Sequence, residues 1–263
     1  RRSRARSDAL SRRYHRSAAA LGLGSAVFLI AGTATAQSGV LDRFHIEPGI
    51  GVTTFTPLGE GMYFQSGMRH NLNLRFPAAR LTGSFDAIPH RPRSWLPGLA
   101  ANLSYMHFGR AAMWSDAAPD EADYPDGVGG YNPHTKQCNG ECGPIRHFNS
   151  SGSLHAVALT LEPYYTNNGW RFGIEVGPAL YRGTWKAHMT VVSDTSPWGP
   201  KGSVETLSHS PKWDWTWVAG ASVAYRNVTL RYTYIHTPPR DMTNKNIPLG
   251  YKGAHMVTLG YRF

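Results

Sequence analysis

Long hydrophobic runs are scarce in this chain of 263 residues, cysteine occurs only twice, and charged residues make up 17% of it. Beyond residue 36 no run of about 18 apolar residues occurs, so the sequence predicts no helical membrane span there. A chain of this length can still form a single all-β unit, since barrels of this size routinely do. The pattern along the chain therefore has to decide the architecture.

The first 36 residues have the composition of a secretory signal peptide. Seven arginines and one aspartate fall within residues 1–17, an apolar run covers 18–31, and Ala34-Thr35-Ala36 precedes Gln37. A basic head, a short apolar middle and an A-x-A exit predict cleavage after Ala36. A retained anchor is the alternative, but the apolar run is short and rich in glycine for a membrane span. We expect a signal peptide at 1–36 and one folded domain at 37–263.

The net charge of the mature chain is much smaller than the +10 of the full sequence. Without residues 1–36 it has 20 Lys and Arg against 16 Asp and Glu, a net charge of +4. This mild excess suits a protein that lies beside anionic lipopolysaccharide and outer-membrane lipid, and it is too small to indicate nucleic-acid binding.

Alternation of apolar and polar residues recurs along residues 37–263. It is clearest in residues 170–181 and 213–225, where Trp, Phe, Ile and Val share one face. Period-2 alternation predicts a strand with one face in lipid and the other in a polar lumen. Fainter examples complete a set of eight: residues 44–56, a strand within 70–88 broken by Pro77, and 99–111, 154–166, 228–237 and 252–263. The fold class we predict is all-β, a transmembrane antiparallel up-and-down barrel of about eight strands.

Link lengths predict which end of the barrel faces the cell exterior. The links at 167–169 and 225–227 are tight Asn/Gly-type hairpins, and such short links belong on the periplasmic side. The longer connections then face outward: residues 57–69, 112–153, 188–204 and 238–251. We expect 112–153 to be a long irregular extracellular loop, because it is rich in Pro, Gly, Asp and Asn.

Charged residues fall at several positions that the alternation points inward. A lumen of eight strands is only wide enough for side chains to fill it, so these charges must pair there. A structural set of ion pairs is our prediction, and a gated proton or ion path is the alternative. The candidates are Glu47, Glu162, Arg171, Glu175, Asp214, Arg231 and Arg262.

Cys138 and Cys142 lie four residues apart in the long loop. An exported protein meets an oxidising environment, so we predict a disulfide between them. Metal binding by two thiolates with His134 or His147 is the alternative. Five carboxylates between Asp116 and Asp126 match no ordered calcium loop, so we predict a solvated acidic segment and no metal or cofactor.

The last strand has a pattern of its own. Val257, Leu259, Tyr261 and the terminal Phe263 alternate with small or polar residues. This resembles the terminal targeting strand of outer-membrane proteins, which implies recognition by the barrel-assembly machinery. As architecture, residues 37–263 resemble the small eight-stranded OmpA-like, OmpX-like and opacity-type surface proteins, which implies a multi-pass barrel in a Gram-negative outer membrane.

A catalytic role needs a nucleophile beside a base. One segment resembles the start of the lipid A deacylase His-x-Ser element: Tyr234-Ile235-His236-Thr237-Pro238. Pro238 occupies the position of the nucleophile there, and proline has no hydroxyl. Ser208-His209-Ser210 offers only a short alternative pairing. We therefore predict a non-enzymatic surface protein whose loops, chiefly 112–153, serve adhesion, contact with a host or surface ligand, or envelope integrity. A lipid A hydrolase and a narrow channel are the alternatives.

Overall fold

The computed structural model describes most of the chain after residue 40. Residues 43–263 form one compact unit. The described residues are 41–58, 68–73, 75–91, 94–117, 131–132, 137–138, 144–194, 199–209, 212–238, 247 and 249–263. The predicted signal peptide and its cleavage site lie outside them. No helix among the described residues has the length and hydrophobicity to cross a membrane.

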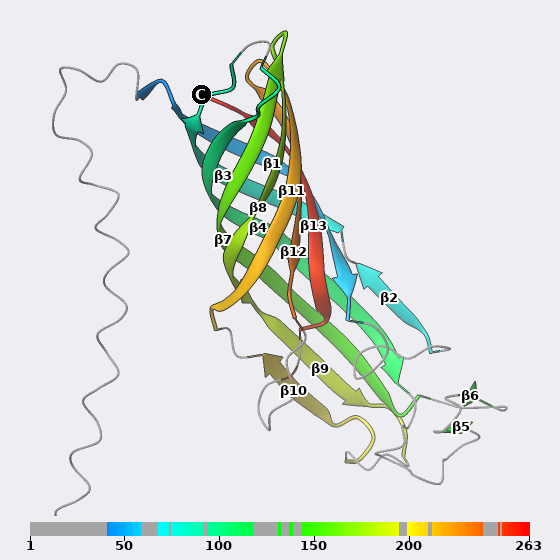
Figure 1. Ribbon diagram of the computed structural model, residues 1–263. Coiled ribbons are helices and arrows are strands. Elements are labelled where there is room, and N and C mark those ends of the chain that lie inside the picture. The colour runs from blue at the N-terminus through cyan, green and yellow to red at the C-terminus, as the bar shows by residue number, and fades with distance from the viewer. Residues whose placement is uncertain are drawn as a thin grey trace, which may run out of the picture. The chain divides into compact units, whose positions relative to one another are not determined.

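Eight antiparallel strands close into a ring, which confirms the predicted fold class (Figure 1). Each strand pairs with the next along the ring, the last strand pairs with the first, and β4 pairs with β7. The eight strands are β1 (Phe44–Pro57), β3 (Arg75–Ile88), β4 (Gly98–Ala117), β7 (Arg146–Asn167), β8 (Trp170–Gly183), β11 (Asp214–Tyr225), β12 (Val228–His236) and β13 (Tyr251–Tyr261).

Five shorter strands lie outside the ring. β2 (His70–Asn73) pairs with the end of β4, β9 (Trp185–Val191) pairs with the start of β7, and β10 (Val204–His209) pairs with β9. β5 (Tyr131–Asn132) and β6 (Gln137–Cys138) form a separate hairpin. The first three lengthen one wall of the barrel beyond the ends of β12 and β13 (Figure 1).

The predicted break at Pro77 is wrong. Pro77 lies within β3 and pairs with Val52 of β1, whereas β4 pairs with β3 only from Ala79 onward. A strand edge without a ladder partner tolerates proline, because no backbone N–H is needed there.

The predicted limits of the long loop are also wrong. β4 and β7 continue into the predicted loop as paired strands, with Ala112–Ala117 on β4 and Arg146–Ser151 on β7. The connection between these two strands therefore covers only residues 118–145. In the same way the predicted loop 188–204 overlaps β9, which ends at Val191. The Pro, Gly, Asp and Asn content of 112–153 suggested a loop throughout, but a strand beyond the bilayer needs no apolar face.

The two short links are two-residue hairpin turns, as predicted. Asn168 and Gly169 both have positive φ, 47° and 82°, as a type I′ turn requires. Arg226 has a φ of 53° in the turn between β11 and β12. Both turns lie at the end of the barrel where β13 finishes, which we take as the periplasmic end because short turns belong there.

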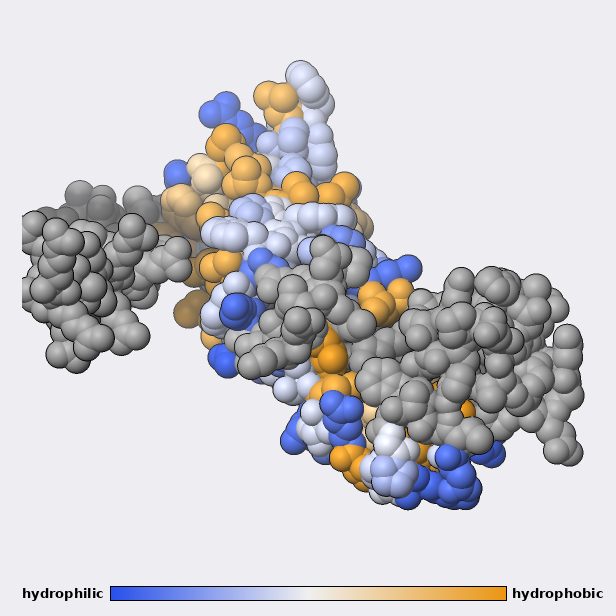
Figure 2. All heavy atoms as spheres, turned by 90° about the horizontal axis from the view of Figure 1, so that it is seen from below, coloured by the Kyte–Doolittle hydropathy of each residue, from blue (hydrophilic) through white to orange (hydrophobic). Residues whose placement is uncertain are grey.

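The exterior of the ring is apolar. Ile50 is 75% exposed and Ile174 is 67% exposed, which in water would be unfavourable for so many neighbouring aliphatic side chains. The belt of exposed aliphatic residues includes Ile46, Val52, Leu81, Leu103, Leu159, Leu161, Val176, Leu230 and Leu259. Figure 2, seen from below, has orange hydrophobic side chains on the flank and blue hydrophilic ones gathered near the lower edge. This surface fits hydrocarbon, and the barrel is a transmembrane one.

The lumen contains two layers of side chains. Towards the periplasmic end it is polar, with Thr82, Ser84, Asn102, Ser104, Thr160, Ser222 and Thr258 buried around charged groups. Towards the extracellular end it is apolar, with Phe55, Met106, Phe108, Leu154, Val218, Ile235, Tyr251 and Met256 buried. The polar side chains therefore lie beneath an apolar layer.

Candidate functional site

Arg231 is the centre of a buried ion-pair cluster in the polar layer. Its guanidinium lies 3.2 Å from a Glu47 oxygen, 3.1 Å from Glu162 and 2.9 Å from Glu175. The three carboxylates come from β1, β7 and β8, and each residue of the cluster is less than 7% exposed. A buried charge is tolerated only when it is paired in this way.

Arg80 is the second cation of the cluster, and sequence reasoning missed it. Its Nη1 and Nη2 donate to the two oxygens of Glu175 at 2.8 and 3.0 Å, a bidentate arrangement. Nη2 also donates to Ser104 Oγ at 2.8 Å. The signal was present, because Arg80, Thr82 and Ser84 alternate with Leu81, but the expected break at Pro77 left the limits of this strand open.

The other predicted lumen charges lie elsewhere. Arg171 and Arg262 contact Asp86 at 3.0 and 3.2 Å near the periplasmic end, and Arg171 Nε is 3.6 Å from Glu162. Asp214 lies towards the extracellular end of β11, where it accepts a hydrogen bond from Tyr181 at 3.3 Å. The structure thus joins Arg171 to the cluster and places Asp214 apart from it.

The two layers together fill the lumen from both ends. Arg80, Arg231 and their carboxylates cross-link five strands. The apolar layer that contains Phe108 lies above them, towards the extracellular end. A charge that passed through would have to leave water and break these pairs. The arrangement favours a structural plug over the ion path that was its alternative.

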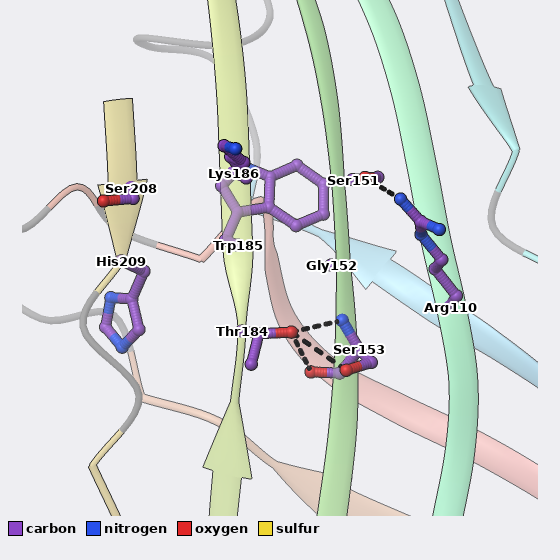
Figure 3. Close-up of a pocket in the computed structure, with 9 residues that line it drawn as sticks. All are labelled: Arg110, Ser151, Gly152, Ser153, Thr184, Trp185, Lys186, Ser208 and His209. Carbon is purple, nitrogen blue, oxygen red and sulfur yellow. Dashed lines mark hydrogen bonds between the residues drawn. The ribbon is translucent and has the colours of Figure 1, made fainter. Parts of the chain in front are cut away.

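A hollow of about 440 Å³ lies in the extended wall, where β8 ends and β9 begins (Figure 3). Its floor is a tight junction of Ser153 and Thr184: their backbones exchange hydrogen bonds of 3.2 and 2.8 Å, and their hydroxyls are 2.9 Å apart. The other lining residues are Arg110, Ser151, Gly152, Trp185, Lys186, Ser208 and His209. No aspartate or glutamate is among these nine, so the hollow is cationic and rich in hydroxyl groups.

The histidines considered for catalysis have other contacts. His236 lies on the exterior with its ring stacked on Trp217 at a centroid distance of 6.1 Å, and Pro238 follows without a hydroxyl. His209 Nδ1 donates to the Ile247 carbonyl oxygen at 2.7 Å. Ser210 lies outside the described residues. Within the described part of the chain no serine is hydrogen-bonded to either histidine, and no group of three or more metal-ligating side chains occurs.

Two further predicted features have different outcomes. The alternating residues of the predicted assembly signal point outward, and Phe263 N donates to the Ile46 carbonyl oxygen at 2.9 Å. Val257, Leu259 and Tyr261 are all at least 40% exposed. Cys142 lies outside the described residues and only the backbone of Cys138 is described, so the disulfide stays a prediction.

Comparison with known proteins finds no matching family model and no matching curated protein. Solved structures that resemble the chain include Ail, the attachment invasion locus protein of Yersinia pestis, with 13% identity over 84% of this chain and 97% of Ail, and a TM-score of 0.33. Neisserial surface protein A is 11% identical over 84% of this chain and 96% of its own, with a TM-score of 0.36. The outer membrane enzyme PagL is 10% identical over 83% and 98%, with a TM-score of 0.34. Similarities of this size assign no activity.

The exterior and the lumen of the barrel are more informative about the class of protein than these comparisons. An eight-stranded ring with an apolar exterior around a polar, ion-paired lumen is the architecture of small outer-membrane barrels. This chain has that architecture, as its sequence predicted.

Proposed function

We propose that this chain is a non-enzymatic surface protein of a Gram-negative outer membrane, inserted by the barrel-assembly machinery after removal of residues 1–36. Its plugged barrel holds extracellular segments, chiefly residues 118–145, for adhesion or another surface contact. One observation carries the proposal: β4 and β7 have 20 and 22 residues, against 9 and 11 for β12 and β13. About 9–11 residues suffice to cross a bilayer, so half of each long strand stands outside it.

The extra length is an ordered platform. Asp116 of β4 accepts from Arg69 at 3.1 Å and contacts His147 of β7 at 2.8 Å, and Phe148 is 1% exposed. Building a paired, ion-bridged wall outside the membrane positions the connecting segment away from the lipid. Functional residues concentrate on loops held by a rigid scaffold, and this favours binding over transport.

A lipid A hydrolase is a weaker hypothesis than a non-enzymatic surface protein. Its catalytic element would need a hydroxyl at Pro238, and the His236 ring is packed against Trp217. Unchanged lipid A mass spectra on overexpression are the expected result, and loss of an acyl chain would contradict our proposal.

Replacing residues 118–144 by an Asn-Gly turn should leave the barrel folded and abolish surface contact. Ala117 and Arg146 are opposite each other, and Ile145 N donates to the Ala117 carbonyl oxygen at 2.9 Å, so a short turn can join the two strands. Folding is checked by the shift of the unboiled band on a detergent gel. Function is checked by attachment of expressing bacteria to a cultured epithelial monolayer. Attachment equal to that of the full chain would refute the role of this segment.

The refolded protein should give no discrete conductance steps in a planar bilayer. The reason is that the Arg231 cluster and the apolar layer above it fill the lumen. A general porin recorded in the same membrane is the positive control. Steady single-channel steps from this protein would instead support the narrow-channel alternative.

A further inference from the structure

Four outward-facing side chains form a polar row across the extended wall. Lys186 of β9 is opposite Ser151 of β7 on one side and opposite Ser208 of β10 on the other. Arg110 of β4 donates from Nη2 to Ser151 Oγ at 2.8 Å. Arg110 therefore contacts Ser151 from β4, and Lys186 lies next to Ser151 on β9, the strand on the other side (Figure 3).

The backbone keeps this row in a hollow. Thr184 lies between the end of β8 and the start of β9. Its hydrogen bonds with Ser153 hold this point close to β7. A side chain at Gly152 would collide with the Thr184 carbonyl oxygen and lie 2.6 Å from the Trp185 ring, so only glycine permits this approach. Trp185, another lining residue, is 2% exposed and packs edge-on against Tyr251, which holds its ring in place. The polar row thus rests on rigid parts of the wall.

The row is positively charged and open to solvent. Arg110, Lys186 and Ser208 are exposed, and among the described residues no carboxylate contacts either cation. Asp116, on the same face of this wall, contacts Arg69 and His147 instead. A planar guanidinium, an ammonium and hydroxyl donors suit the tetrahedral oxygens of a phosphate or sulfate ester.

The position of the hollow indicates where such an ester comes from. Along the outward face of β7, Leu161 and Leu159 lie in the apolar belt, and Ser153 and Ser151 follow a few residues further out. Strands rise about 3.3 Å per residue, so the hollow begins roughly 20 Å beyond Leu159 along the tilted strand. That is where the saccharide headgroups of the outer leaflet lie above their acyl chains.

We propose that this hollow binds a phosphate ester on the saccharide headgroup of an outer-leaflet glycolipid, with Arg110 and Lys186 holding the phosphate. Ser151 and Ser208 supply hydroxyl donors to its remaining oxygens. The inference rests on the proposed outer-membrane setting but not on what residues 118–145 contact.

The test titrates the refolded full-length protein in detergent with bisphosphorylated lipid A, and separately with the same glycolipid after enzymatic removal of its phosphates. Wild-type protein should bind the phosphorylated form at least about tenfold more tightly, since charge-assisted hydrogen bonds are the strong ones. Arg110→Ala/Lys186→Ala should lose this preference. The matched control, Arg75→Ala/Lys252→Ala, removes the same two charges at the same end of the barrel and should keep it.

Three outcomes would overturn the proposal. Equal loss in both double variants would mean that diffuse charge attracts the lipid, and no loss in either would mean that the hollow is not used. Equal competition by the water-soluble phosphorylated disaccharide would remove the assignment to a membrane lipid. A folded gel band for each variant excludes misfolding, and the 118–144 replacement should bind lipid A normally, which separates this site from the proposed function.

Discussion

Replacing Arg231 with methionine is expected to lower the free energy of unfolding by about 3–5 kcal/mol, because three carboxylates would remain buried without their shared cation. Arg231 contacts Glu47, Glu162 and Glu175 within 3.2 Å, and only Arg80 would remain within the cluster to pair with Glu175. The measurement is the urea midpoint of the folded, unboiled gel band of the refolded protein.

A control variant and a double variant make this prediction specific. Arg226→Met changes an exposed arginine in the β11–β12 turn and should leave the urea midpoint where it is. Adding Glu47→Gln to Arg231→Met should restore part of the loss, since Glu47 pairs with Arg231 and its charge would otherwise stay buried. If Arg231→Met unfolds at the wild-type midpoint, the buried ion pairs of Arg231 contribute nothing to stability, contrary to this expectation.

Gly51→Ala has the second large expected effect, and it acts through shape alone. Gly51 of β1 lies opposite Thr258 of β13, and a methyl group there would collide with the Val257 carbonyl oxygen and lie 2.7 Å from Thr258 Cα. Both contacts are with backbone, which cannot rotate away. Overpacking of this kind typically costs about 1–3 kcal/mol, and here it falls on the pairing that closes the ring.

Gly83→Ala provides the control for Gly51→Ala. Gly83 of β3 also sits in a ring strand, but the added carbon would come no closer than 3.9 Å to the Leu103 carbonyl oxygen. The folded yield on the detergent gel should fall steeply for Gly51→Ala and stay unchanged for Gly83→Ala. Similar yields for both would show that the two strands separate easily at Gly51, contrary to the structure.

Local alternation was sufficient for most of the fold. Ile174 and Val176 point to lipid and Glu175 to the lumen because neighbouring side chains on a strand face opposite ways, and this can be read from three consecutive residues. The same reasoning predicted eight strands and the inward positions of Glu47, Glu162 and Arg231, and Asn/Gly chemistry predicted the two short turns. It failed at Pro77, because a strand edge without a ladder partner tolerates proline. It also failed at 112–153, because a strand outside the bilayer needs no apolar face.

Tertiary structure decided which charges meet and where the extended wall lies. Arg231 contacts Glu47, 184 residues away, and Arg80 contacts Glu175, 95 residues away. Such pairs depend on the register and closure of the ring, which link residues that no short pattern connects. The hollow with Arg110 and Lys186 likewise needs the Thr184–Ser153 hydrogen bonds and the pairing of β4, β7, β9 and β10. The sequence alone therefore determined the class of barrel and which residues face lipid, because these depend on the two-residue period of a strand, whereas the sites arise from contacts between strands.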